Sequence, residues 1–143
     1  MSSARQPLNN YFMDIARLVS ERSTCNRKKV GTVLVKDQRI IGTGYNGSLP
    51  GAPHCTDSIC DTYNDQVHGE TCLRTTHSEI NSISCAAKYG ISTENCTAYV
   101  TCFPCYRCLQ VLIMAGINKV VYDEEYVDVR NHEIASNILF VKI

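Results

Sequence analysis

The sequence predicts an α/β fold in which helices cover both faces of a β-sheet. Three observations favour this class: apolar residues at helical spacing over Leu8–Glu21, two β-branched runs over residues 30–45, and alternating strand-like and helix-like segments from residue 77 onwards. The alternation implies right-handed crossovers and a largely parallel sheet. The chain has 143 residues, enough for a substantial core, so we expect a single domain over 1–143.

The first half begins with an amphipathic helix at Leu8–Glu21. Val30–Val35 and Arg39–Tyr45 are predicted to form a hairpin around the turn Lys36-Asp37-Gln38. Glycine is dense around the end of the second strand, which suggests that the backbone passes close to a neighbouring strand or a ligand. The glycines are Gly42, Gly44 and Gly47.

The stretch from Asn46 to Thr76 lacks periodicity. Loops of this length in compact domains are usually functional or disordered. This one carries a group of metal-ligand residue types, namely His54, Cys55, Cys60, His68 and Cys72. We therefore expect that a metal could order it.

The second half is predicted as helices and strands in alternation. A helix over His77–Tyr89 ends at Gly90, and a second helix opens at Pro104 and ends at Gly116. A short helix is expected within the irregular segment Asp123–Asn137. The strands are expected at Thr97–Phe103, Lys119–Tyr122 and Ile138–Ile143.

Composition excludes some classes of function. Fourteen basic and fourteen acidic residues give a net charge of zero, without the basic excess of a protein that grips nucleic acid. No apolar run approaches the roughly 20 residues of a membrane helix. The nine cysteines and an N-terminus without a secretory signal pattern indicate a reducing, cytoplasmic location, where metal binding explains cysteines better than disulfides do.

Two short stretches, Thr76–Ile80 and Phe103–Cys108, are interpreted as halves of one zinc site. His77, Cys105 and Cys108 supply three ligands, and a catalytic zinc leaves its fourth position to water. The positive end of the predicted helix favours anionic sulfur, which helps the cysteines to bind metal as thiolates. The alternative is a structural zinc knuckle, which would normally close with a fourth protein ligand.

Glu79 lies two residues after His77, where a general acid/base is needed. The order H-x-E followed by P-C-x-x-C is the signature of zinc-dependent nucleobase deaminases. The alternative is an ordinary glutamate at the start of a helix.

With these motifs, the chain resembles the deoxycytidylate deaminases of the cytidine deaminase superfamily, in particular phage, viral and bacterial members. The resemblance extends over nearly the whole chain. Beyond the zinc motifs it rests on Lys29-Val30-Gly31, Gly44-Tyr45-Asn46-Gly47-Ser48, Tyr99-Val100-Thr101 and Ala115-Gly116-Ile117. It implies a three-layer α/β/α fold with a five-stranded mixed sheet, and commonly a homo-hexamer.

The resemblance implies hydrolytic deamination of dCMP to dUMP, which supplies the precursor for dTMP synthesis. Glu79 would take a proton from water, protonate the ring at N3 and deliver a proton to the leaving amine. Whether dCTP is also a substrate stays open. The alternatives are a nucleic-acid editing deaminase that acts on cytosine or adenine, and a non-catalytic zinc-binding scaffold.

Four residues are candidates for holding the nucleotide. Asn46 resembles the position that hydrogen-bonds the sugar in the family, with a simple turn role as its alternative. Arg27 and Lys28 match a basic segment suited to the 5′-phosphate, although either could be a solvated surface charge. Tyr126 resembles an aromatic residue near the nucleotide, with core packing as the alternative.

The resemblance also suggests feedback by dCTP and dTTP through the glycine-rich loop of a hexamer. The candidate residues for this regulation are Gly44, Tyr45, Asn46 and Gly47. Lys88 is a further candidate, for a subunit interface or a regulatory contact.

A second, structural zinc is expected from the pattern of some phage and bacterial relatives. That pattern falls on Cys25, Cys55, His68 and Cys72, with Cys60 as a reserve ligand. Such a site would fix the long loop through metal-binding free energy. The alternative is that free cysteines are small buried apolar residues, which we expect for Cys85 and Cys96. Cys102 is either another of these or part of the pocket.

Overall fold

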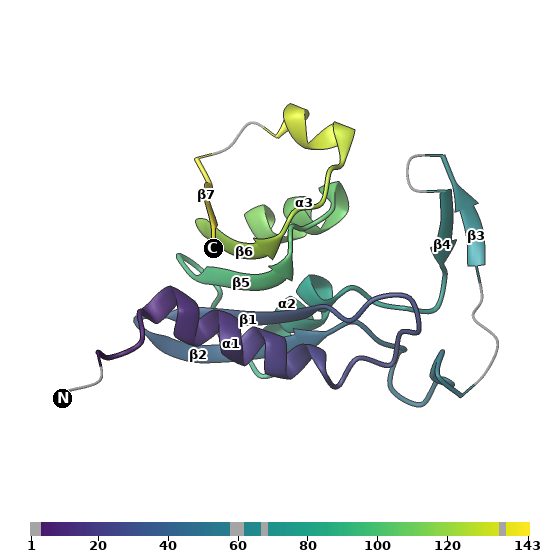
Figure 1. Ribbon diagram of the computed structural model, residues 1–143, viewed down its shortest axis with the longest axis horizontal. Coiled ribbons are helices and arrows are strands. Elements are labelled where there is room, and N and C mark those ends of the chain that lie inside the picture. Colours follow the sequence, from purple (N-terminus) through teal and green to yellow (C-terminus); the bar gives the residue numbers. More distant parts are fainter. Residues whose placement is uncertain (1–3, 58–61, 67–68, 135–136) are drawn as a thin grey trace.

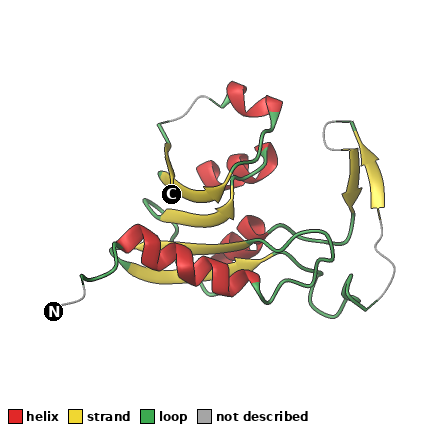
Figure 2. Cartoon of the chain, viewed as in Figure 1, coloured by secondary structure: helices red, strands yellow, loops and turns green. Residues whose placement is uncertain are grey.

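The computed structural model describes residues 4–57, 62–66, 69–134 and 137–143. Within these ranges a five-stranded sheet in the order β2-β1-β5-β6-β7 lies between helices, and a two-stranded sheet, β3-β4, stands apart from it (Figures 1 and 2). The elements are α1 (Leu8–Ser20), β1 (Gly31–Lys36), β2 (Arg39–Tyr45), β3 (Thr62–Asp65), β4 (Gly69–Cys72), α2 (Ser78–Lys88), β5 (Thr97–Cys102), α3 (Tyr106–Met114), β6 (Lys119–Glu124), the 3-10 helix η1 (Val129–Glu133) and β7 (Leu139–Lys142).

The five-stranded mixed sheet is confirmed, but the prediction of a largely parallel sheet is wrong for its first half. β1 pairs antiparallel with both β2 and β5, whereas β5, β6 and β7 are parallel. The turn between β1 and β2 is shorter than predicted, because Lys36 belongs to the strand. Asp37 and Gln38 make the turn alone with positive φ angles of 49° and 62°, and such a tight turn imposes an antiparallel pair.

Helices cover both faces because successive side chains of a strand point to opposite sides. On β1, Val33 and Val35 pack with the buried residues of α1. Leu34 faces the other way and packs with Val100 and with Leu112 of α3. This arrangement confirms the three-layer architecture.

The close approach predicted from the glycine-rich end of β2 is made to a helix, not to a strand or a ligand. A Cβ atom at Gly44 would lie 2.4 Å from the backbone oxygen of Ser78 and 2.5 Å from the backbone nitrogen of Ser82. Only glycine lets β2 pack directly on the first turns of α2. Gly44 thus helps to position α2.

The segment 46–76 contains a hairpin that the sequence did not predict. Its strands, β3 and β4, are short, and their residues are exposed or half-buried. They show none of the apolar alternation by which a strand is recognised. In Figure 1 this hairpin stands beyond one end of the main sheet.

The two helices that carry the zinc motif begin at ligand residues. His77 is the N-cap of α2, and Cys105 is the N-cap of α3. The prediction that Pro104 opens α3 is therefore wrong, since the helix starts at Tyr106 and Pro104 precedes the cap. The helix expected within 123–137 is η1. In the described residues, no helix combines the length and the apolar character that crossing a membrane requires.

Candidate active site

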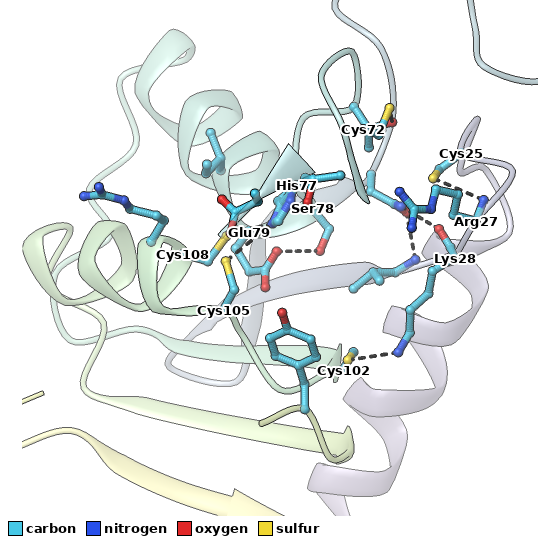
Figure 3. A pocket seen from close by; sticks show the side chains of 18 of the residues that line it. Cys25, Arg27, Lys28, Cys72, His77, Ser78, Glu79, Cys102, Cys105 and Cys108 are labelled. Atoms are coloured by element: carbon cyan, nitrogen blue, oxygen red, sulfur yellow. Dashed lines mark hydrogen bonds between the residues drawn. The ribbon is translucent and has the colours of Figure 1, made fainter. Parts of the chain in front are cut away.

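The starts of α2 and α3 meet at the carboxyl ends of the parallel strands β5 and β6, which is where α/β folds usually bind ligands. A cavity of about 650 Å³ opens there. One side consists of the residues before β1, another of the β3–β4 hairpin, and another of the segment after β6. Figure 3 shows the side chains that point into it.

His77, Cys105 and Cys108 converge in the lining of this cavity, with their ligand atoms within 4.8 Å of one another. His77 Nδ1 lies 3.3 Å from Cys108 Sγ and 3.6 Å from Cys105 Sγ. Usual Zn–S and Zn–N bond lengths in a tetrahedron place sulfur and nitrogen about 3.6 Å apart. The three residues therefore fit one zinc ion. In the described part of the chain no other His, Cys, Asp or Glu completes this cluster as a fourth ligand, as a structural zinc knuckle would require.

The ligand set is an ion pair before metal binds. The hydrogen bond to Cys105 raises the pKa of His77 to about 9. Hydrogen bonds from Cys108 and His77 lower the pKa of Cys105 to about 4, while the Cys105 thiolate and burial raise the pKa of Cys108. These shifts favour a protonated His77, a thiolate at Cys105 and a thiol at Cys108.

Glu79 lies beside the ligands and is 4% exposed. Burial raises the pKa of its carboxyl, which suits a group that must both accept and donate protons near neutral pH. Ser78 Oγ donates to Glu79 Oε2 at 3.1 Å, and Thr32 Oγ1 lies 2.8 Å from Ser78 Oγ (Figure 3 draws Ser78 and Glu79). Because the Ser78 hydroxyl gives its proton to Glu79, Thr32 is the donor to Ser78, and β1 thereby orients the carboxylate.

The structure brings the four nucleotide candidates to the same cavity. Arg27, Lys28, Asn46 and Tyr126 all line it, together with the zinc ligands. Tyr126 is half-buried, and its burial raises its pKa to about 12. The chain order separates these residues by a hundred positions, so their convergence depends on the fold.

The contacts of Asn46 give it a more definite role than the sequence did. Its side-chain nitrogen donates to the backbone oxygen of Lys28 at 2.6 Å, and its side-chain oxygen accepts from the Val30 nitrogen at 2.8 Å and from Ser23 Oγ at 2.7 Å. An amide carries two N–H groups, so one remains for a ligand. Asn46 therefore fixes the segment before β1 against the glycine-rich loop.

The two cations before β1 differ in their surroundings. Lys28 Nζ lies 3.1 Å from a carboxylate oxygen of Glu124 and 3.2 Å from Cys102 Sγ. Cys102 is thus part of the pocket. Arg27 is exposed and donates to the backbone oxygen of Glu70 in the β3–β4 hairpin at 2.6 Å.

Sequence reasoning missed two further cations of the cavity, Arg107 and Arg130, and the acidic partner of the second, Asp128. Arg107 lies between the two zinc cysteines in the sequence, so the motif itself could have suggested it. Arg130 and Asp128 lie in η1 and at its cap, where no local pattern marks a site.

The candidates for regulation lie outside the cavity, except Asn46. Gly44, Tyr45 and Gly47 are not among its lining residues. Lys88 is exposed in the last turn of α2, at the opposite end of the helix from His77, and its ammonium lies 5.8 Å from the centre of the Tyr89 ring.

The proposed second zinc ligands are brought together in part. Cys55 Sγ lies 3.7 Å from Cys72 Sγ, and Asn26, next to Cys25, donates to the backbone oxygen of Cys55. Cys25 and Cys72 also line the cavity. His68 and Cys60 lie outside the described residues. Of the other cysteines, Cys96 is buried and Cys85 half-buried, as expected for small apolar residues.

One histidine and two cysteines beside a buried glutamate, at the edge of a three-layer α/β/α fold, define a class: hydrolases that use zinc to deaminate nucleobases. Comparison with known proteins agrees. Residues 7–124 match the cytidine and deoxycytidylate deaminase zinc-binding region, and the chain belongs to that family.

Individual relatives show which members of the family the chain is similar to. The chain is 43% identical over 118 residues to ComE operon protein 2 of Bacillus subtilis, covering 82% of this chain and 60% of that protein. It is 36% identical over 128 residues to the deoxycytidylate deaminase of Mycobacterium phage D29, covering 85% of this chain and 98% of the phage protein. The crystal structure of dCMP deaminase from the cyanophage S-TIM5, in complex with dCMP and dUMP, superposes with a TM-score of 0.79 at 26% identity, over 98% of this chain and 100% of that one.

Proposed function

We propose that the protein hydrolyses the 4-amino group of dCMP, giving dUMP and ammonia, and so supplies the precursor for dTMP. The observation that carries the proposal is the buried Glu79 carboxylate beside the His77, Cys105 and Cys108 cluster, in a cavity that also holds Asn46 and several cations. The phage relatives named above, which act on this nucleotide, support it.

The protein's own groups supply proton transfer and orientation. His77, Cys105 and Cys108 would hold a zinc ion, which would supply the Lewis acidity needed for a water nucleophile at neutral pH. Glu79 takes the two protons of the attacking water in turn, and delivers the first to ring N3 and the second to the departing amine. Burial raises the pKa of Glu79, which makes its carboxylate a stronger base than an exposed one. Ser78 and Thr32 hold the carboxylate in place.

The remaining groups of the cavity would bind the sugar and the phosphate. The free N–H of Asn46 suits the 3′-hydroxyl, and Arg27, Lys28 and Tyr126 offer charge and a hydroxyl to the 5′-phosphate. Arg27 is the stronger candidate of the two cations, because Lys28 is already paired with Glu124. A nucleic-acid editor is disfavoured by the zero net charge of the chain.

The finer parts of the proposal concern assembly, location and metal content. We propose a homo-hexamer in the cytoplasm, a compartment that keeps zinc-binding cysteines reduced. In this hexamer dCTP and dTTP act as effectors through the loop of Gly44, Tyr45, Asn46 and Gly47, and Lys88 lies near a subunit contact. We also propose a second zinc held by Cys25, Cys55, His68 and Cys72. The Cys55–Cys72 separation of 3.7 Å supports it, since two thiolates on one zinc lie about 3.8 Å apart.

The test of the reaction is Glu79→Gln. This amide keeps the shape of the side chain but cannot relay protons, so kcat for ammonia release from dCMP should fall by about 10²–10⁴ while the catalytic zinc stays bound. Assays of dCMP, dCTP and deoxycytidine side by side identify the preferred substrate. An undiminished rate in the zinc-loaded variant would contradict the role of Glu79.

A further inference from the structure

Asp128 joins two parts of the cavity that are separate in the sequence. Its carboxylate accepts a hydrogen bond from the backbone nitrogen of Tyr106, the first residue of α3, at 3.1 Å. The same carboxylate caps η1 by accepting from the backbone nitrogen of Arg130 at 3.0 Å. One buried side chain thus caps both the helix that carries the zinc cysteines and the short helix at the wall of the pocket.

The start of α3 has a particular need for this cap. The first N–H groups of a helix lack partners inside the helix, and a side chain at the N-cap normally accepts from one of them. Here the N-cap is Cys105, and within the described residues its side chain makes no capping hydrogen bond. A thiolate committed to a metal is poorly placed to cap its own helix. Asp128, 23 residues further along the chain, takes the Tyr106 N–H instead.

Arg130 makes a carboxylate tolerable at this position. Asp128 is 4% exposed, and an unpaired charge at such a buried position would be costly. The Arg130 guanidinium grips it as a fork, with Nε 2.9 Å from Oδ1 and Nη2 2.8 Å from Oδ2. This pair and the two backbone hydrogen bonds hold the pKa of Asp128 far below its usual range.

The pair also lies against Tyr106, the first residue of α3, and at the wall of the pocket. The Arg130 guanidinium lies 5.3 Å from the centre of the ring of Tyr106, a residue that lies between the two zinc cysteines in the sequence. Its hydrogen bond to Asp128 raises the pKa of Arg130, and the Cys105 charge contributes to the same shift. Arg130 lines the cavity, as does Tyr126, two residues before Asp128. A shift of Asp128 would therefore move Cys105, Cys108 and the Tyr126 wall relative to one another.

We propose that Asp128 is a positioning residue, which with Arg130 holds the first turn of α3, and hence Cys105 and Cys108, in register with the Tyr126–Arg130 wall of the pocket. The role deepens the proposed function by linking the geometry of the metal ligands to that of the nucleotide wall. Residues that hold metal ligands in place through hydrogen bonds commonly affect metal affinity or activity by about 10–100-fold.

The test is Asp128→Asn, which keeps the size and one acceptor but cannot hold the guanidinium with two oxygens. We expect zinc affinity, measured by competition with a chelating dye, to fall by about 10-fold or more. The visible absorption bands of the Co²⁺-substituted protein should change, because they report the arrangement of the thiolates. At saturating zinc, kcat should fall and KM for dCMP should rise.

Asp123→Asn is the matched control. It makes the same substitution five residues earlier, where Asp123 pairs with Arg17 of α1 at 2.8 Å, away from α3. We expect wild-type Co²⁺ spectra, zinc affinity and kinetics from this variant. If Asp128→Asn does not fold, Arg130→Lys is the second test, because lysine keeps the positive charge but cannot make both hydrogen bonds of the guanidinium to Asp128. We expect the same change in the Co²⁺ spectrum from this variant.

A purely structural role for Asp128 predicts a different result. The variant would then unfold at a lower temperature but keep the Co²⁺ spectrum, zinc affinity, kcat and KM of the wild type, and the proposal would be overturned. Wild-type spectra and affinity in Arg130→Lys would overturn it equally. The metal measurements need no substrate, so they stand even if dCMP proves not to be the substrate.

Discussion

The two cysteine-rich regions of the molecule differ in what holds their ligands. His77 and Cys105 begin helices that pack on the central sheet, and Cys108 is fully buried in the first turn of α3. Cys55 lies in an irregular stretch, and Cys72 ends a strand of the small separate sheet. The ligands of the first site are held by helices that pack on the core. In the second, a metal would itself be a large part of what holds the loops together.

Removing one cysteine from each region tests this difference and should give the largest effects. Cys108→Ser should lose the catalytic zinc and reduce dCMP turnover more than about a thousand-fold, because the nucleophile depends on the metal. Cys72→Ser should retain the catalytic zinc and reduce turnover far less than Cys108→Ser does, although the hairpin that ends at Cys72 lines the cavity. It should lose one zinc per chain and lower the unfolding temperature by about 5–10 °C, since the lost metal-binding energy is folding energy.

Metal analysis, calorimetric unfolding and ammonia release on the same preparations provide the measurements. Cys108→Ser and Cys72→Ser form a matched pair, because each replaces one proposed zinc-ligand sulfur by a hydroxyl. A well-folded wild type with one zinc per chain, unchanged in Cys72→Ser, would remove the second zinc from the proposal. Loss of turnover in Cys72→Ser with the catalytic zinc retained would show that the two regions are not independent.

The same contrast explains what could be predicted from the sequence. His77, Glu79, Cys105 and Cys108 were identified because ligand spacing and the helix start are local properties of the chain. The helices and the strands of the main sheet followed from apolar periodicity, and their errors are confined to ends, as with Pro104, which lies before the N-cap of α3. The structure brings His77, Cys105 and Cys108 together, and their roles stay predictions.

Other features depend on contacts that no local pattern shows. The β3–β4 hairpin consists of short polar strands without an apolar face. Thr32 and Asp128 act on Glu79 and α3 from distant parts of the chain. The glycine pattern at Gly44 showed that something lies close, but only the fold identifies it as the first turns of α2.

The number of protons released on zinc binding is a further property of the catalytic site that can be measured. Metal-free His77 has a pKa of about 9 and Cys105 one of about 4, while the pKa of Cys108 is raised. At pH 7 zinc must therefore displace about two protons, from His77 and Cys108, because the ligands bind as neutral imidazole and thiolates. Since protons compete with metal, affinity at this site should rise about 100-fold per pH unit up to about pH 9, and less steeply above it.

Titration calorimetry of metal-free protein in buffers of different ionisation enthalpy gives the proton count. The Cys72→Ser variant is the right material, because only the catalytic site then takes up zinc. A count near zero at pH 7 would mean that the ligands are already deprotonated, and would contradict the ion pair between His77 and Cys105.

The smallest expected effect concerns Asn46, which lies between the two regions. It accepts from Ser23, two residues before Cys25, and donates to the backbone oxygen of Lys28 at the pocket. Asn46→Asp keeps the acceptors but turns a carboxylate oxygen towards the Lys28 oxygen, which should cost about 1–3 kcal/mol of stability. Because the basic segment then shifts and the N–H for the sugar is lost, KM for dCMP should rise about tenfold, with kcat changed less than about threefold.

Asn81→Asp separates binding from stability in this last case. Asn81 donates from its side-chain nitrogen to the backbone oxygen of Tyr45 at 2.8 Å, so the substitution removes the same kind of bond from the adjacent residue of the loop. Asn81 does not line the cavity, and its variant should lose stability with KM unchanged. If steady-state kinetics gave the same KM for both variants and the wild type, Asn46 would be a structural tie alone, and the sugar contact would have to come from another residue of the pocket.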